Sequence, residues 1–222
     1  IDTSPGVCTS ILVDRYLEGK HRLWAIAAAF GDNLHSSAHQ LAESLKLDPN
    51  KIKELRELGE LINYNSYGET INDLHFSPET LFLALQPFSD PFEFYHTSVE
   101  LKQLREGFRS DMFLAEEILP LRQSPAGRIY QFPNVAWCRR VSGVFSNQVA
   151  REAPHLAHAI LVERPGGAFL VGVRAPIANP QGAEKLCLKF SGGGRSAAAG
   201  INHLAPEDVE RFFADFEKQF AN

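Results

Sequence analysis

The feature of this sequence that most constrains its fold is a change of hydrophobic pattern about halfway along the chain. Up to residue 118, apolar side chains recur every three to four positions, as they do on one face of an α-helix. After Pro120, β-branched and aromatic runs appear, and "AHAILVERPGGAFLVGVRAP" (157–176) is typical of a β-hairpin. The sequence therefore predicts an α/β protein with two domains, a mostly helical one over residues 1–118 and a second one over residues 119–222 that contains a sheet.

Charge is divided along the chain in a similar way. Residues 1–118 hold 10 Lys and Arg against 19 Asp and Glu, whereas residues 119–203 hold 10 against 3. Two interpretations are open: the second half holds an anionic ligand, or it has a solvated basic surface. Both place the positive charge of this protein, whose net charge is −5, in the second domain.

Composition excludes several classes of protein. The longest apolar run, Leu23 to Phe30, is too short to cross a bilayer, and no secretory signal pattern is present. The three cysteines are scattered and odd in number, which is typical of free thiols in a reducing compartment. We therefore expect a cytoplasmic protein without a membrane partner.

The stretch "SGGGRSAAAG" (191–200) is the strongest local motif. Three consecutive glycines lose much conformational entropy on folding, so they form either a slack linker or a place where a ligand approaches the backbone. Backbone N–H groups beside the guanidinium of Arg195 and the hydroxyl of Ser196 could hold a phosphate. The Gly-Lys-Ser/Thr ending of a Walker motif is missing, and a bare glycine triplet is more often a flexible turn.

Together with "GVRAP" (172–176) and "RRVSGVFSNQVA" (139–150), this motif resembles the DHH-associated C-terminal domain of the DHH phosphoesterase superfamily. The resemblance implies a mixed-sheet α/β substrate-binding domain. That family usually carries GGGH, and the GGGR form is similar to the corresponding domain of alanyl-tRNA synthetases. The family includes single-strand exonucleases, nucleotide and oligoribonucleotide phosphatases, cyclic dinucleotide phosphodiesterases and exopolyphosphatases. The resemblance implies contacts to a substrate phosphate or nucleotide for Arg174, Gly192, Gly193, Gly194 and Arg195, with Ser196 beside them.

The first half resembles the end of the catalytic DHH domain. "IDTSPGVCTSILVDRYL" (1–17) is similar to the helix that follows the Asp-His-His motif, and "AIAAAFGDN" (25–33) is similar to the family's next motif. The aspartate of that motif is a manganese ligand, which the resemblance carries over to Asp32. Residues 1–118 are then the C-terminal part of a DHH-type domain with a helical connector. The complete protein would use Mn²⁺ or Mg²⁺ to activate water.

The sequence also departs from the family, because it contains neither an Asp-His-His triplet nor an Asp-x-Asp pair. Asp32 alone cannot hold a metal pair, so we expect this chain by itself to retain no metal, to show no catalytic residue and to be inactive. Because the chain begins with Ile1 and starts abruptly, we expect an N-terminal portion to be absent from it; otherwise it is a non-catalytic relative.

The function predicted for the complete protein is that of a metal-dependent phosphoesterase acting on a nucleotide, an oligonucleotide or a related phosphate. The alternative is a non-catalytic module that binds nucleic acid or a nucleotide. The expected partner is a phosphate-bearing small molecule or a short single-stranded nucleic acid, with a homodimer as a candidate assembly.

Three further groups of side chains are open to two interpretations each. Asp32 with His35 and His39 forms either a metal cluster or an N-cap followed by surface histidines. Tyr64 with Tyr67 and His75 forms either a base-stacking surface or a loop between helices. Arg139 and Arg140, beside Trp137, either contact a nucleic acid or belong to a solvated helix start.

Overall fold

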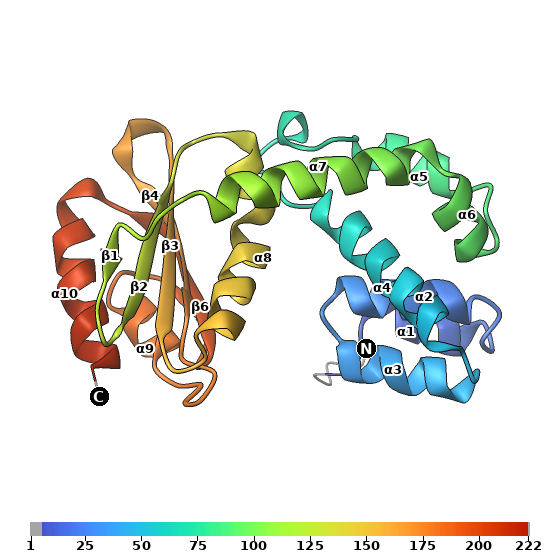
Figure 1. Cartoon of the computed structure of the whole chain (residues 1–222), viewed down its shortest axis with the longest axis horizontal. Helices are drawn as coiled ribbons and strands as arrows, with labels where there is room; N and C mark the ends of the chain where they lie inside the picture. The colour runs from blue at the N-terminus through green and yellow to red at the C-terminus, as the bar shows by residue number, and fades with distance from the viewer. Residues whose placement is uncertain (1–5, 222) are drawn as a thin grey trace. The chain divides into compact units, whose positions relative to one another are not determined.

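The structure is a computed structural model that describes residues 6–221. The chain forms two compact units: the first ends at Arg109 and the second begins at Ser110. The boundary between the units falls within α7 (Val99–Glu116), before residue 119, where the sequence predicts that the second domain begins (Figure 1). No helix within residues 6–221 combines the length and the apolar composition needed to span a bilayer.

The first unit is helical, as its 3.6-residue pattern predicts. Before α7 it contains α1 (Thr9–Tyr16), α2 (Arg22–Gly31), α3 (His35–Ser44), α4 (Pro49–Tyr64), α5 (Pro78–Leu85) and α6 (Pro91–Thr97), with a 3₁₀ turn at Ile71–Asp73. Three of these helices begin at a proline that follows a capping Asp or Ser; Asp48, for example, accepts bonds from the backbone N–H groups of Asn50 and Lys51. Of the stretch 1–17 that resembles a family helix, residues 1–5 lie outside the described part.

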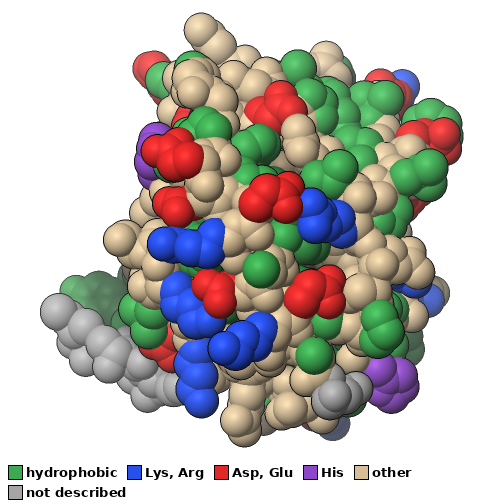
Figure 2. Space-filling model, turned by 90° about the vertical axis from the view of Figure 1, so that its left-hand side faces the viewer, with side chains coloured by type: hydrophobic (Ala, Val, Ile, Leu, Met, Phe, Trp, Pro, Cys, Tyr) green, Lys and Arg blue, Asp and Glu red, His purple; other side chains and the backbone are tan. Residues whose placement is uncertain are grey.

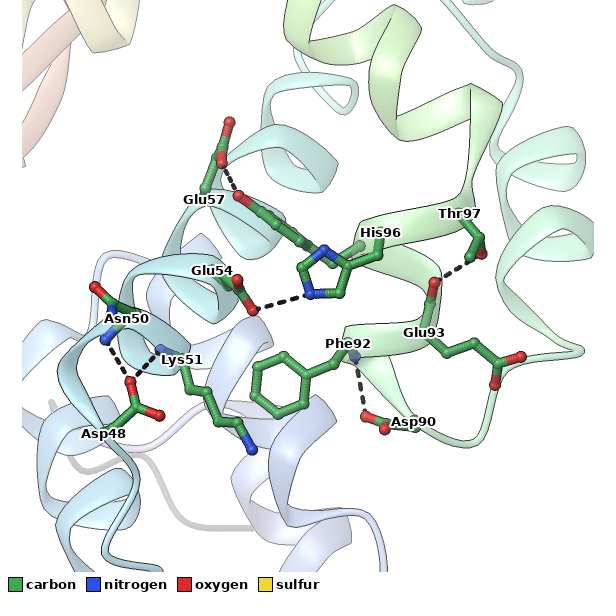
Figure 3. A network of polar contacts seen from close by, with 11 residues as sticks. Asp48, Asn50, Lys51, Glu54, Glu57, Asp90, Phe92, Glu93, His96 and Thr97 are labelled. Carbon is green, nitrogen blue, oxygen red and sulfur yellow. Dashed lines mark hydrogen bonds and ion pairs between the residues drawn. The ribbon is translucent and has the colours of Figure 1, made fainter.

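Small residues allow α2 and α4 to pack closely. The buried face of α2 is rich in alanine, and Gly59 of α4 lies against the backbone of Ala27, where an added Cβ would be 1.8 Å from the carbonyl oxygen. Helix α6 contacts the other end of α4 through polar groups (Figure 3): His96 lies 3.4 Å from Glu54, and the Tyr95 hydroxyl donates to Glu57. Burial raises the pKa of Glu57, but hydrogen bonds from Arg105 and Tyr95 outweigh this effect and lower it overall. These polar groups are paired with one another and serve packing.

The second unit is built on one six-stranded sheet. Its strands are β1 (Arg122–Gln123), β2 (Gly127–Phe132), β3 (Ala157–Glu163), β4 (Phe169–Arg174), β5 (Gly193–Arg195) and β6 (Ala198–Leu204), in the order β1-β2-β3-β4-β6-β5. Strands β2 and β3 are parallel and all other neighbours are antiparallel, so the sheet is mixed, as predicted. The β3–β4 pair is the hairpin that the sequence predicts.

Helices cover both faces of this sheet (Figure 1). Helix α8 (Ala136–Glu152) packs on one face, while α9 (Ala183–Leu188) and α10 (Val209–Phe220) pack on the other. Phenylalanines of α10 fill the core of the second face; they are Phe212, Phe213, Phe216 and Phe220. Cys138 and Cys187 are free thiols within these layers, and burial raises the pKa of each to about 12, which keeps them protonated.

Candidate anion-binding site

The glycine stretch forms an edge strand, and is neither the slack linker nor the flexible turn that the sequence leaves open. Residues 193–195 form β5, which pairs with the first half of β6. Ala197 belongs to the turn, and Ala198 and Ala199 belong to β6. Small residues therefore oppose each other across the strand pair, with Gly194 of β5 opposite Ala199 of β6. The backbone N–H groups here are therefore partly engaged in a ladder, because each strand of a pair supplies donors to the other.

Two of the three glycines have a structural reason to lack a side chain. A Cβ on Gly192 would lie 2.3 Å from the carbonyl oxygen of Gly200. Gly194 has φ +147°, and a Cβ there would lie 2.5 Å from the Cα of Ala199. Gly193 is different, because a Cβ on it would meet no atom within 4 Å. Its bare backbone faces open space, where a ligand can approach it.

Strand register places four basic residues in one line across the sheet. Arg128 of β2 is opposite His158 of β3, which is opposite Arg174 of β4. Arg174 is opposite Ala198 of β6, which in turn is opposite Arg195 of β5. Directly opposed residues point to the same face of a sheet. We call Arg128, His158, Arg174 and Arg195 the basic row.

The basic row lies on the face covered by α8. Arg128, Tyr130 and Phe132 stand at every second position of β2 and so share one face of the sheet. Both aromatic rings pack on Phe145 of α8, at 5.3 Å between ring centroids. Arg174 also reaches this helix, because its Nε donates to Oδ1 of Asn147 at 2.9 Å. The row crosses the sheet at the end where β2 and β3 begin and β4 ends. Arg174 and Arg195 are separated by two strand spacings, or roughly 10 Å, with the methyl group of Ala198 between them.

Several nitrogen atoms of the row have no protein partner. The Nε of Arg128 is buried and makes no hydrogen bond within residues 6–221, and both ring nitrogens of His158 are buried without a well-formed hydrogen bond, since the backbone of Leu156 has only a weak effect on the pKa of this ring. Burial, together with the charge of Arg128, lowers the pKa of His158 to about 4, so the ring is neutral at physiological pH. Arg195 is exposed, and its guanidinium makes no hydrogen bond or ion pair with any described residue. Such a row attracts an anion that supplies acceptor oxygens.

Most other basic side chains of the second unit are paired. On the face formed by α9 and α10, basic side chains lie beside acidic ones (Figure 2): Lys189 pairs with Asp215 at 2.8 Å, and Arg122 pairs with Glu210 at 2.8 Å. Arg122 also lies over the ring of Phe213. These pairs show that part of the basic excess in residues 119–203 is neutralised by nearby carboxylates.

The structure assigns a role to Arg140 that differs from both interpretations of Arg139 and Arg140. Both stand near the start of α8, but the Arg140 side chain is only 12 % exposed and bonds Asp111 through Nε at 2.7 Å and Nη2 at 3.0 Å. Arg139 bonds the side chain of Asn134 at 2.6 Å. Arg140 is therefore a packing residue, so for it both the nucleic-acid contact and the solvated helix start are wrong, whereas for Arg139 both interpretations stay open.

Asp32, His35 and His39 do not form the metal cluster that their spacing raises as one interpretation. Helix α2 ends at Gly31 and α3 begins at His35, so the three residues do not share one helix. His35 bonds Asn33, and His39 packs on Phe30 with ring centroids 5.3 Å apart. Within the described part of the chain, no three His, Cys, Asp or Glu side chains are placed to hold a metal ion. These residues do not fit a metal pair, and Asp32, which is exposed, stays a predicted single ligand.

The aromatic residues between α4 and α5 belong to the core of the first unit. Tyr64 is 1 % exposed, and its hydroxyl is 2.6 Å from Nε2 of His75. The same ring packs on His75 and on Phe108. Base stacking on Tyr64 is therefore excluded, and of the two interpretations the loop between helices is correct for this residue.

Arg128 and His158 are the members of the row that sequence reasoning missed. The signal for His158 was present, since it is the single polar residue in the apolar run "AHAILV" (157–162) of a buried strand. A buried polar residue needs a partner or a function. Arg128 carried no such signal, because its place in the row depends on the parallel pairing of β2 with β3.

Comparison with known proteins defines the fold. No family model matches the chain, and no curated protein matches it in sequence. A solved structure described as the DHH domain of a member of the s1p family of ribosomal proteins is 15 % identical with a TM-score of 0.53, over 93 % of this chain and 52 % of its own. The pGpG-specific phosphodiesterase PggH from Vibrio cholerae is 16 % identical with a TM-score of 0.51, over 83 % of this chain and 73 % of its own.

The chain thus spans about half the length of the first of these structures. It has the fold of DHH-domain proteins, which confirms the α/β class and the resemblance inferred from the sequence at the level of fold.

Proposed function

We propose that this chain, which has the fold of DHH-domain proteins, binds the phosphate of a nucleotide or short oligonucleotide on its basic row, as the substrate-binding part of a phosphoesterase. The observation that carries the proposal is the register that brings Arg174 and Arg195 to one face of the sheet with only Ala198 between them. Guanidinium groups bind phosphate oxygens in a fixed, two-pronged geometry, and the small side chain between them leaves room for the anion.

Each residue of the site has a separate role in this proposal. Asn147 fixes the guanidinium of Arg174, so that little conformational entropy is lost when the anion binds. Arg195, which has no partner among the described residues, closes on the phosphate from the edge strand. Gly193 lets the ligand approach the backbone because nothing occupies the space above it. A solved neighbour named as a phosphodiesterase supports a phosphoester as the ligand.

Hydrolysis is the finer part of the proposal. The sequence predicts Mn²⁺ or Mg²⁺ for the complete protein, and such ions activate water and neutralise phosphoryl oxygens. Residues 6–221 contribute only the predicted ligand Asp32, so further ligands would have to come from outside them. The second candidate function is a module that binds a nucleotide or nucleic acid without cleaving it, for which the basic row alone would suffice.

Binding of a labelled single-stranded oligonucleotide, measured by fluorescence anisotropy at several salt concentrations, tests the phosphate site. Arg195→Ala should weaken binding by about ten- to a hundredfold, the size of a lost charge-assisted hydrogen bond, and should flatten the salt dependence. Arg164→Ala is the matched control, because this half-buried arginine lies beyond the opposite end of β3 and bonds the backbone of Asn202. Equal affinity for the wild type and Arg195→Ala would refute the proposal.

The glycines provide an independent check. Gly193→Ala should weaken binding without lowering stability, since its Cβ meets no atom of the fold, whereas Gly194→Ala should lower stability because of its positive φ and the contact with Ala199. Unchanged binding by a folded Gly193→Ala variant would show that the ligand does not reach this strand.

An assay for Mn²⁺-dependent hydrolysis by the intact gene product separates the two candidate functions. Release of phosphate or of a mononucleotide supports the phosphoesterase. Salt-dependent binding of an oligonucleotide that stays unaltered supports the module.

A further inference from the structure

The first unit contains a buried carboxylate oxygen without a partner. Asp14 of α1 is 2 % exposed. Its Oδ2 accepts a hydrogen bond from Nε of Arg22, at 3.0 Å, within an ion pair. Its Oδ1 is buried as well, and no group of residues 6–221 donates to it. A buried acceptor without a donor lowers stability, so this oxygen points to a donor that does not belong to the described part of the chain.

The same carboxylate lines a pocket between α1 and the start of α2. The pocket has a volume of about 230 Å³. A cavity of about 150 Å³ is large enough for benzene, so this pocket has room for a small organic molecule. Asp14 is the only acidic side chain of the lining, whose other residues are Thr9, Ser10, Val13, His21, Trp24 and Ala25.

The acceptors of the lining match the donors of a primary ammonium group. An ammonium group carries three N–H donors and no acceptor. Besides Oδ1 of Asp14, the lining contains the hydroxyls of Thr9 and Ser10, and neither hydroxyl makes a hydrogen bond with another described residue. Arg22 is bonded to the other oxygen of Asp14, which leaves Oδ1 for a second cation. The acidic balance of residues 1–118, with 19 Asp and Glu against 10 Lys and Arg, also favours a positively charged ligand.

The remaining wall is mostly apolar and includes an aromatic ring that the fold holds in place. Nε1 of Trp24 donates to the backbone oxygen of Ser89 at 3.1 Å, and the ring lies 6.2 Å from that of Phe94. Val13 and Ala25 add aliphatic surface. Indole binds cations through its face better than the other aromatic side chains do, and it also packs on apolar groups. The lining therefore suits a ligand with one charged end and one apolar end.

We propose that this pocket binds a small organic molecule that carries a primary ammonium group on an apolar body. The ammonium group donates to Oδ1 of Asp14 and to the hydroxyls of Thr9 and Ser10, and the apolar body lies against Val13 and Trp24. The inference does not rest on the proposed function, because none of these residues belongs to the basic row. Arg195→Ala should therefore leave binding at this pocket unchanged.

The fluorescence of Trp24 in the whole chain tests this inference. The chain has two tryptophans, so Trp137→Phe in the second unit leaves Trp24 as the only one. We call this variant the reporter protein. The probes are benzylamine, which is protonated at pH 7 as a lysine side chain is, and benzyl alcohol, which has the same ring without the charge. Benzylamine should change the emission and bind about tenfold more tightly than benzyl alcohol, the size of a charge-assisted hydrogen bond.

Two variants of the reporter protein remove acceptors from the pocket, and a third is the control. Asp14→Asn keeps the size of the side chain but removes its charge, so it should abolish the preference for benzylamine. Ser10→Ala removes one hydroxyl at a half-buried position and should weaken the binding of benzylamine by about fivefold. Glu43→Gln removes an exposed carboxylate of the same unit and should leave the preference unchanged.

Three results would overturn the inference. They are equal affinity of the reporter protein for the two probes, no change in Trp24 emission with either probe, and a preference for benzylamine that survives in a folded Asp14→Asn variant. If Asp14→Asn unfolds because Arg22 loses its partner, Ser10→Ala decides the question. Unchanged binding of benzylamine by Ser10→Ala would then overturn the inference, and the expected weakening would support it.

Discussion

Two groups of buried basic side chains in the second unit are built in opposite ways. Arg140 of α8 is 12 % exposed and faces Asp111, which is 6 % exposed, through two hydrogen bonds. Arg128 and His158 of the basic row have buried nitrogen atoms that no group within residues 6–221 satisfies. The first arrangement matches a cation with a carboxylate and stabilises the contact between α7 and α8. The second leaves buried polar atoms unmatched, which lowers stability.

Pairing with a carboxylate distinguishes basic side chains that stabilise this fold from those that are available to bind an anion. Residues 119–203 contain a large excess of basic side chains, but carboxylates neutralise three of them, Arg122, Arg140 and Lys189, through ion pairs. Arg128 and Arg195 of the basic row make no ion pair with a described residue. A cation without a carboxylate is the better guide to an anion site than the total charge.

Asp111→Asn should have the largest effect on stability. The variant removes the charge that compensates buried Arg140, and breaking a buried pair in this way lowers the free energy of unfolding by about 3–5 kcal/mol. Urea unfolding measures the change, with Asp208→Asn as the control, because its ion pair with Arg211 is exposed. A loss of less than about 1 kcal/mol for Asp111→Asn would contradict the structural role of this pair.

The pH dependence of stability should show the second largest effect. The pKa of His158 is about 4 in the folded chain, against 6.5 as its ordinary value, so the unfolded chain binds the proton more readily. The contribution of this ring to stability is therefore complete above pH 6.5 and is lost as the pH falls toward 4. The loss at the lower pH is about 3 kcal/mol.

His158→Leu isolates this effect, because carboxylates that also titrate in the same range are common to both proteins. The difference in unfolding free energy between wild type and variant should shift in favour of the variant between pH 7 and pH 4. A difference that does not change with pH would show that His158, despite lying between Arg128 and Arg174, is not held neutral by the fold.

Arg128→Met should have a smaller effect of the opposite sign to Asp111→Asn. Met keeps the apolar stem that packs on the sheet and removes an Nε that has no partner, so the free energy of unfolding should stay unchanged or rise by about 1 kcal/mol. Urea unfolding at neutral pH gives the value. If the variant is destabilised by more than about 1 kcal/mol, Arg128 is a packing residue like Arg140, and the contrast between the two groups is wrong.

Glu60→Gln in the first unit should have the smallest effect. Glu60 pairs with Arg56 at 2.7 Å, one helical turn away on α4, and both side chains are about half exposed. Water and salt screen such a pair, so its loss should change the free energy of unfolding by no more than about 0.5 kcal/mol. A larger change would mean that exposed and buried pairs in this protein differ less than the comparison assumes.

Much of the fold could be predicted from the sequence, because the relevant signals are local. Asp48 followed by Pro49 predicts the start of α4, and the Pro165-Gly166-Gly167 turn predicts the β3–β4 hairpin. The glycine stretch could not be predicted as an edge strand, since that depends on pairing with β6. The sequence left open whether Asp32, His35 and His39 form a metal cluster, and the structure excludes this interpretation because a three-residue connection between α2 and α3 breaks their helical spacing.

The sequence by itself determined the helical first half, the α/β second half and the presence of Arg174 and Arg195 as candidates for phosphate binding. Only the tertiary structure decided that Arg128 and His158 join them and that Arg140 does not. The row joins residues from four strands far apart in the chain, so it exists only once strand order and register are set. A shift of one residue in any pairing would move a side chain to the opposite face of the sheet.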